Sequence, residues 1–261
     1  MAPDQASSPI KPVVDAAQQA ARHETAPGRV RRLRIVLFQV YLLAAVAGFS
    51  VLAFLASTTA YLPVDLTITR AVQLLRFAGF APLMVAISWF GFLPQTAIGI
   101  AAVCILLYLL GLHWEAYYSL LVVAVEALIN LFIKVVIHRP RPSPNLVHVL
   151  ANLRSYSFPS GHVMLYTTYF GFLLFLAYAL LRRSWKRTLL MVIFGGLILL
   201  VGLSRVFEGE HWASDVLGGY LAGSLILAAA IYVYRWGKGK FSPRQPTAPV
   251  PADEIQKNSQ N

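Results

Sequence analysis

A series of long apolar runs constrains this chain more than any other feature of its sequence. Six runs approach or reach the roughly 20 residues that a helix needs to cross a bilayer. They lie at 35–58, 92–111, 116–137, 163–181, 188–204 and 216–234. Charged residues make up only 13% of the chain, about half the usual share of a soluble domain. The sequence therefore predicts an all-α integral membrane protein with six transmembrane helices, and it argues against a soluble or disordered chain.

One further stretch, 63–76, is apolar but is interrupted by Asp65, Arg70, Gln73 and Arg76. It is too short and too polar to cross a bilayer. We therefore expect it to form an interfacial helix between the first and second transmembrane helices.

The two ends of the chain differ from the middle in composition. Residues 1–34 are rich in Ala, Gln, Pro and Ser, and residues 235–261 are polar and rich in Pro. We expect both to be disordered tails on one six-span domain at 35–234. The run 35–58 is too long for the core of a signal peptide, so we expect a retained first helix. Because Cys104 is the sole cysteine, an intramolecular disulfide is excluded.

The distribution of basic residues orients this layout. With six spans, 15 of the 22 Lys and Arg residues fall on the side that carries both termini, including the basic loop 182–187. The positive-inside rule then places both termini in the cytoplasm and loops 59–91, 138–162 and 205–215 outside. The formal net charge of +11 is thus explained by orientation in an inner membrane, without a nucleic-acid partner.

Unusual polar residues gather in three clusters at span ends that face the outer side. The clusters contain Lys134, Arg141 and Pro142; Pro159, Ser160, Gly161 and His162; and Ser204, Arg205, His211 and Asp215. Their shared position predicts one site at the outer face of the membrane.

Lys134 is the most telling of these residues, because a charge at the centre of a membrane helix costs roughly 2.5–3.5 kcal/mol and less near an end. The alternative is a lysine that only snorkels to the interface. Asn130 lies one turn earlier on nearly the same face, so we expect this face to turn toward protein, with Asn130 in support. The prolines around Arg141 predict that the helix ends near His138 and that Arg141 folds back over its end.

Ser160 is a favourable N-cap residue for the helix that follows, which is its structural explanation. The same geometry directs free backbone N–H groups at an anion. Gly161 allows a ligand to approach the backbone closely.

His211 and Asp215 are four residues apart. If a helix begins near them, the carboxylate can accept a hydrogen bond from one imidazole nitrogen and leave the other as a nucleophile or base. Together with His162 this pair is also compatible with a metal site. The three cations of the clusters would repel a divalent ion and suit a phosphate. The residues therefore predict phosphoryl transfer with a histidine nucleophile, without a metal or another cofactor.

In these motifs the chain resembles the type 2 phosphatidic acid phosphatase (lipid phosphate phosphatase) superfamily. The motifs of that family are K-x6-R-P, P-S-G-H and S-R-x5-H-x3-D, and each stands here with its spacing intact. The resemblance covers about 63–234 and implies a bacterial membrane member of the family.

The resemblance implies a role for each matched residue. It makes His211 the nucleophile that forms a phosphohistidine, Asp215 the group that orients it, and His162 the general acid. The implied phosphate-binding residues are Lys134, Arg141, Arg205, Ser160 and Gly161. The implied supporting residues are Pro142, Pro159 and Ser204.

A few residues stand outside these implied roles. Trp212-Ala213 occupies the place where many family members carry Tyr-Pro. Glu208 and Glu210 flank Gly209 beside the nucleophile, and we interpret them as a solvated rim. Glu126 lies in mid-span, where a carboxylate is a functional candidate by default; we favour a structural pairing with a polar neighbour.

The sequence thus predicts a metal-independent membrane phosphatase that hydrolyses lipid phosphates or diphosphates. Candidate substrates are isoprenyl diphosphates, phosphatidic acid and phosphatidylglycerol phosphate, with the undecaprenyl carrier preferred. One alternative is a lipid phosphotransferase of the same fold that uses a sugar or lipid hydroxyl as acceptor. A six-span transporter is disfavoured, because the polar groups lie at one face and not near the midplane. Membrane lipids and the substrate are the expected partners, and no obligate protein partner is inferred.

Overall fold

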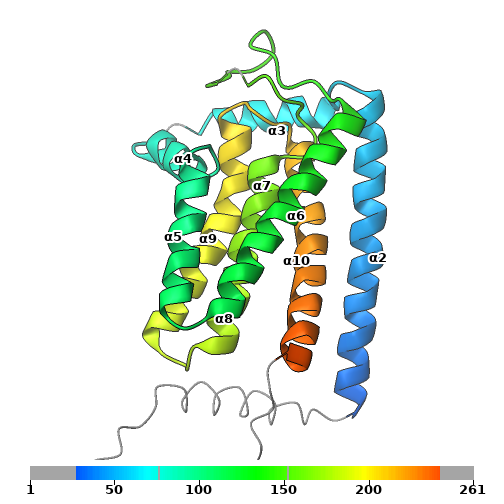
Figure 1. Cartoon of the computed structure of the whole chain (residues 1–261). Helices are drawn as coiled ribbons and strands as arrows, with labels where there is room; N and C mark the ends of the chain where they lie inside the picture. Colours follow the sequence, from blue (N-terminus) through cyan, green and yellow to red (C-terminus); the bar gives the residue numbers. More distant parts are fainter. Residues whose placement is uncertain (1–27, 76, 152, 242–261) are drawn as a thin grey trace, which may run out of the picture.

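The computed structural model describes residues 28–75, 77–151 and 153–241, and all regular structure in these ranges is helical. The helices are α2 Gly28–Thr58, α3 Pro63–Gln73, α4 Phe80–Trp89, α5 Gln95–Leu109, α6 His113–Ile137, α7 Gly161–Leu165, the π-helical turn η1 Tyr166–Phe170, α8 Gly171–Leu180, α9 Trp185–Phe207 and α10 Ala213–Phe241. The long helices run alongside one another as a bundle (Figure 1).

The predicted tails extend too far into the chain. Residues 28–34 form the start of α2 and residues 235–241 the end of α10. Arg, Lys and Trp do not break a helix, so the helices continue past the ends of the apolar runs. The remaining tail residues, 1–27 and 242–261, lie outside the described part of the chain.

Five segments among the described residues are long and apolar enough to cross a membrane. They are Arg29–Thr58, His113–Ile137, Gly161–Leu180, Trp185–Phe207 and Ala213–Lys238. The sequence predicted a span at 92–111, but the helix found there, α5, has only 15 residues. At 1.5 Å per residue it is about 22 Å long, less than the hydrocarbon core of about 30 Å. The helix starts only at Gln95 because Pro94 disfavours helical geometry in the residue before it.

Helix α3 lies across one end of the bundle (Figure 1). Pro63 occupies its first turn, and the carboxylate of Asp65 accepts a hydrogen bond of 3.0 Å from the backbone N–H of Leu62. Asp65 and Thr69 are buried, so one face of α3 packs onto the bundle. The helix ends at Gln73, three residues before the end that the sequence predicted.

The segment Gly161–Leu180 forms the centre of the bundle. Val163, Tyr166 and Phe172 are fully buried, whereas Leu128 on α6 and Leu199 on α9 have 67% and 75% of their surface exposed. An outer surface this apolar fits a lipid environment.

An ion pair between a half-exposed lysine and a buried glutamate joins α6 to α10 at the end of the bundle opposite α3 (Figure 1). Lys238 Nζ and the hydroxyl of Tyr234 each lie 2.5 Å from Oε1 of Glu115, whose side chain is buried. This contact is remote from the three motif clusters.

The motif clusters converge at the end of the bundle that α3 covers. His138 ends α6 with a left-handed backbone conformation (φ 56°), and Arg141 follows in the next loop. α7 starts at that same end, where α9 ends and α10 begins (Figure 1). Segments far apart in sequence thus meet around one small volume.

Candidate active site

His211 lies in the turn between α9 and α10 and is 1% exposed. Its Nε2 atom is 3.3 Å from Nη1 of Arg141. Because a guanidinium has only donors, Nε2 faces it with its lone pair, and the proton of a neutral imidazole is on Nδ1. That proton points toward Ser157, whose Oγ is 3.5 Å from Nδ1. An Nε2 atom that carries no proton is the feature that a nucleophile requires.

Asp215 lies behind His211, but the two do not share a helix as expected, because α10 begins at Ala213. The distance from Nδ1 of His211 to Oδ2 of Asp215 is 3.7 Å, longer than a hydrogen bond. The hydroxyl of Ser157 lies between them and donates to the same Oδ2. Ser157 therefore connects the histidine to the carboxylate, a role that no sequence motif indicates.

The charge state of His211 follows from its surroundings. Burial lowers the pKa of His211 well below its ordinary value, and the positive charges of Arg141, Lys134 and Arg205 lower it further. The imidazole is therefore neutral at neutral pH and needs no deprotonation before it attacks.

Arg141 is held over His211 by two loops. Its Nη1 donates to the carbonyl of Glu210 at 2.7 Å, and its Nε donates to the carbonyl of Ser155 at 2.7 Å. Burial lowers the pKa of Arg141 to about 10, so the guanidinium stays charged at neutral pH. Arg141 thus folds back from the end of α6, as the sequence predicted.

His162 is in the first turn of α7, and its Nε2 is buried without a hydrogen-bond partner among the described residues. The ring of Phe92 packs edge-on against it, with centroids 4.6 Å apart. A Cβ atom at Gly91 would overlap the imidazole ring. The turn before α5 therefore sets the position of this histidine, a function that the sequence did not reveal.

Ser160 adopts the extended conformation of an N-cap residue, yet its side chain makes no capping hydrogen bond. Its Oγ is buried and has no partner in the described part of the chain. A Cβ atom on Gly161 would lie 3.2 Å from Oδ1 of Asn130. Packing against Asn130 therefore explains the glycine at this position.

Glu208 and Glu210 are not a solvated rim; that interpretation is wrong. Their exposed fractions are 3% and 2%, and both carboxylates contact the guanidinium of Arg205, with Glu208 Oε2 at 2.7 Å from Nη1. Gly209, with φ 66°, turns the chain between them. Burial raises the pKa of Glu208, although Arg205 opposes that shift. The ring of Phe92 lies 5.2 Å from the Arg205 guanidinium carbon, so Phe92 contacts both Arg205 and His162.

Lys134 turns toward protein, as predicted. Its Nζ donates to the carbonyl of Tyr156 at 2.6 Å. Asn130, one turn earlier, donates to the sulfur of Met164 at 3.4 Å. Glu126 is buried a further turn away, and its pairing with a polar neighbour stays a prediction.

The remaining predicted residues shape the surroundings of the site. Pro142 and Pro159 are buried in the loop between α6 and α7. The hydroxyl of Ser204 donates to the carbonyl of Val201 within α9 at 2.7 Å, so it stabilises that helix end.

Arg139 was not predicted, yet it is one of the most buried charged residues, at 1% exposure. Its guanidinium forms ion pairs with Asp65 and Asp215 and donates to the hydroxyl of Ser214. Within the described residues, no group of three or more His, Cys, Asp or Glu side chains is arranged to hold a metal ion.

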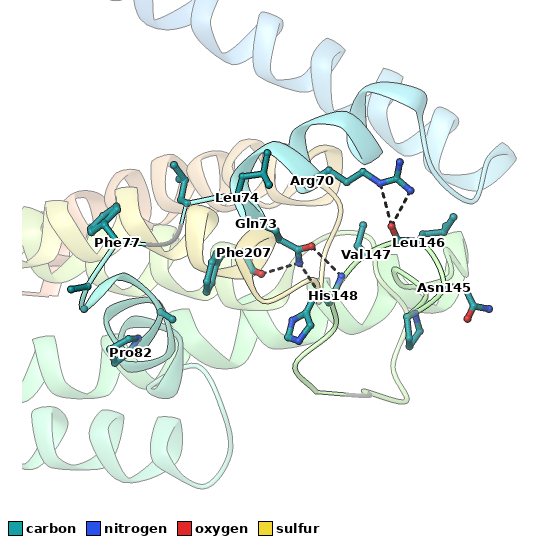
Figure 2. Close-up of a pocket in the computed structure, with 15 residues that line it drawn as sticks. Arg70, Gln73, Leu74, Phe77, Pro82, Asn145, Leu146, Val147, His148 and Phe207 are labelled. Atoms are coloured by element: carbon teal, nitrogen blue, oxygen red, sulfur yellow. Dashed lines mark hydrogen bonds between the residues drawn. The ribbon is translucent and has the colours of Figure 1, made fainter.

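An open pocket lies beside this site, between α3, the start of α4 and the loop 144–148 (Figure 2). Gln73 donates to the carbonyls of His148 at 2.6 Å and Phe207 at 3.0 Å, and Arg70 donates to the carbonyl of Leu146 (Figure 2). None of the predicted catalytic or phosphate-binding residues lines the pocket. These contacts attach α3 to the loops of the site.

Comparison with known proteins shows the family. Residues 115–238 match the PAP2 superfamily. The chain is also 32% identical over 186 residues to phosphatidylglycerophosphatase B of Bacillus subtilis (strain 168), covering 68% of this chain and 87% of that protein. The chain belongs to the PAP2 superfamily. The resemblance inferred from the three motifs is thereby confirmed.

One further curated protein and two solved structures are also similar to this chain. A putative undecaprenyl-diphosphatase of Escherichia coli (strain K12), YbjG, is 39% identical over 79 residues, which cover 30% of this chain and 35% of that protein. The crystal structure of a PAP2-type phosphatidylglycerolphosphate phosphatase from Bacillus subtilis has a TM-score of 0.65 at 27% identity, covering 78% of this chain and 98% of that one. Aquifex aeolicus LpxE shares the fold, with a TM-score of 0.54 at 20% identity, over 66% of this chain and 96% of that one.

Proposed function

We propose that this protein is a membrane phosphatase that hydrolyses lipid phosphates or diphosphates through a phosphohistidine on His211. One observation carries the proposal: the lone pair of His211 Nε2 is buried 3.3 Å from the Arg141 guanidinium. A phosphate bound by Arg141 would have its phosphorus next to the nucleophile.

The proposed reaction has two steps. His211 Nε2 attacks the phosphorus, the bond from phosphorus to the leaving oxygen breaks, and His162 gives that oxygen its proton. Water then attacks the phosphohistidine while His162 takes a proton from it, which releases inorganic phosphate and restores His211. Asp215, connected through Ser157, would stabilise the positive charge that the imidazole gains in the first step.

Buried polar atoms without partners support this assignment. In the described residues these include Oγ of Ser160, Nε2 of His162 and Nε of Arg205. A buried polar group without a hydrogen bond costs roughly 1–3 kcal/mol. A phosphate is an acceptor that can satisfy all three. We assign Lys134 and the Gly161 backbone to the same binding site on the family motif.

We further propose a six-span arrangement in an inner membrane, with both termini cytoplasmic and the site facing outward. The five long helices supply five crossings. Helix α5, with the turn before it, would supply the remaining one, because a bilayer can thin around a short span. Helix α3 would then lie at the outer interface above the site.

The substrates are proposed from this location and from the relatives. A site at the membrane edge holds a phosphate whose lipid tail stays in the bilayer. The relatives are named as acting on phosphatidylglycerol phosphate and undecaprenyl diphosphate. We therefore expect activity on lipid mono- and diphosphates and poor activity on soluble phosphates.

Phosphate release from detergent-purified protein tests this proposal. The panel is phosphatidylglycerol phosphate, phosphatidic acid, undecaprenyl diphosphate and water-soluble glycerol phosphate, each with and without EDTA. We expect release from the lipids that survives EDTA, is absent in His211→Ala, and is unchanged in the exposed-histidine control His148→Ala. Equal kcat/KM for lipid and soluble phosphates would contradict the lipid assignment. Activity that is lost in EDTA and restored by one divalent ion would contradict the metal-free mechanism.

A further inference from the structure

One buried guanidinium joins two carboxylates from different helices at this site. Nη2 of Arg139 lies 2.9 Å from Oδ2 of Asp65 in α3, and its Nη1 lies 2.5 Å from Oδ1 of Asp215 in α10. All three side chains are at most 1% exposed. The family motifs include Asp215 but neither Arg139 nor Asp65.

We propose that Arg139, anchored by Asp65, is a positioning residue that fixes the Asp215 carboxylate behind the nucleophile His211. This inference rests on the proposed function, because it assigns a task within that reaction. It also makes helix α3 part of the catalytic support.

The shape of the guanidinium explains why it can position the carboxylate. A guanidinium is a rigid planar fork, so its two arms fix two acceptors in defined directions. One arm donates to Oδ1 of Asp215. The other carboxylate oxygen, Oδ2, accepts hydrogen bonds from the hydroxyl of Ser157 and from the backbone N–H of Trp212, the latter at 2.9 Å. With both oxygens held, the carboxylate cannot rotate away from His211.

Asp65 is equally well fixed. Its carboxylate accepts hydrogen bonds from the backbone N–H and the hydroxyl of Ser214, both at 2.8 Å, and from the N–H of Leu62. The backbone carbonyl of Arg139 accepts a hydrogen bond of 2.8 Å from the N–H of Ser157. Arg139 thus holds both groups that stand behind the imidazole, Asp215 by its side chain and Ser157 by its backbone.

A purely structural role is the competing explanation, since a buried carboxylate without its partner destabilises a fold. The two roles differ in what they do to His211. The charged and titratable groups around that imidazole are Asp65, Lys134, Arg139, Arg141, His162, Arg205, Glu208, Glu210 and Asp215. Loss of the Arg139 charge leaves Asp215 uncompensated, which favours a protonated imidazole at higher pH.

The experiment compares Arg139→Gln, the double variant Arg139→Gln/Asp65→Asn, and the control Glu115→Gln. The control removes the buried Glu115 carboxylate from its ion pair with the half-exposed Lys238 at the opposite end of the bundle. Three readouts are taken: melting temperature, kcat and KM on a lipid phosphate, and titration of His211 by NMR of nitrogen-15-labelled histidine. The His211 signal is assigned by its loss in His211→Asn.

We expect Arg139→Gln to lower kcat by roughly 10- to 100-fold, as loss of an orienting partner does, with little change in KM. Its His211 should titrate at higher pH than in wild type. The double variant should regain part of the melting temperature, because Asp65 no longer leaves a buried carboxylate unpaired, but it should not regain kcat, because Asp215 still lacks its guanidinium. Glu115→Gln should lower the melting temperature and leave the titration of His211 unchanged.

Recovery of kcat in the double variant would overturn the proposal, because Arg139 would then serve only to neutralise Asp65. An unchanged His211 titration in Arg139→Gln would overturn it too. If Arg139→Gln fails to fold, the double variant still decides through kcat. A wild-type protein that hydrolyses no lipid phosphate would contradict the proposed function and not this inference, which the NMR titration tests without substrate.

Discussion

Nη1 of Arg141 lies 3.3 Å from Nε2 of His211. Burial lowers the pKa of His211, and the positive charge next to its Nε2 lowers that pKa further. In the proposed reaction, the same guanidinium would hold the phosphate that His211 attacks. One contact therefore links the charge state of the nucleophile to substrate binding.

This link predicts the pH dependence of an Arg141→Gln variant. In the wild type, burial and then Arg141 hold the pKa of His211 well below its ordinary value, so kcat/KM falls only in strongly acidic solution. Without Arg141 the pKa of His211 rises, and the acid-side fall moves to higher pH. KM should rise as well, because a phosphate ligand is lost. A pH series of kcat/KM measures both effects.

Arg154→Gln is the matched control for this series, because Arg154 is an exposed arginine in the same loop. It should leave the pH profile unchanged. The same acid-side fall in wild type and Arg141→Gln would show that Arg141 does not influence the nucleophile.

The ion pair between Glu208 and Arg205 leads to a second prediction, which concerns the binding of an oxyanion such as vanadate. The Glu208 carboxylate forms an ion pair with Nη1 of Arg205, and burial raises the pKa of that carboxylate. Above that pKa the carboxylate is ionised and competes with a phosphate for Arg205; below it, the competition ends. Vanadate inhibition of the wild type should therefore strengthen as pH falls.

In Glu208→Gln this competition is absent at every pH. We expect vanadate to bind roughly tenfold tighter at neutral pH, as for one charge-assisted hydrogen bond released to the ligand. The inhibition constant measured across the pH range checks this, with Glu115→Gln as control. Weaker vanadate binding in Glu208→Gln would instead mean that this carboxylate orients Arg205 for the ligand.

The orientation of the protein gives a third prediction. In a Cys104→Ala background, Asn145→Cys should react with an impermeant maleimide added to intact cells, whereas Ser184→Cys and Lys240→Cys should not. Asn145 lies in the exposed loop after α6, and Ser184 precedes α9 at the other end of the bundle. The opposite labelling pattern would place the site on the cytoplasmic side.

The sequence pointed to residues that the fold brings together, but not to the contacts that connect them. Motif spacing singled out His211 and Arg141, which lie 3.3 Å apart in the structure, and their catalytic roles stay a prediction. Arg139 and Asp65 carry no such signal, since their ion pair joins positions 74 residues apart. The sequence contains several arginines near helix ends, and only the folded chain shows which of them is buried between two carboxylates.

Two other differences have local causes. Glu208 and Glu210 look like surface residues in the sequence, and they are buried because the turn at Gly209 directs both at Arg205. The span expected at 92–111 is a shorter helix, Gln95–Leu109. The apolar run continues through Pro94, but the helix begins only after it. In both cases the local structure is determined by a turn, which the pattern of hydrophobic residues does not indicate.

The covalent intermediate tests the central claim most directly. Protein is mixed with a lipid phosphate that carries phosphorus-32, quenched within one turnover, and digested for peptide mapping. The account predicts an acid-labile, base-stable label on the peptide that contains His211, present in wild type and in His148→Ala and absent in His211→Ala. A label that persists in His211→Ala, or turnover of that variant at the wild-type rate, would contradict it.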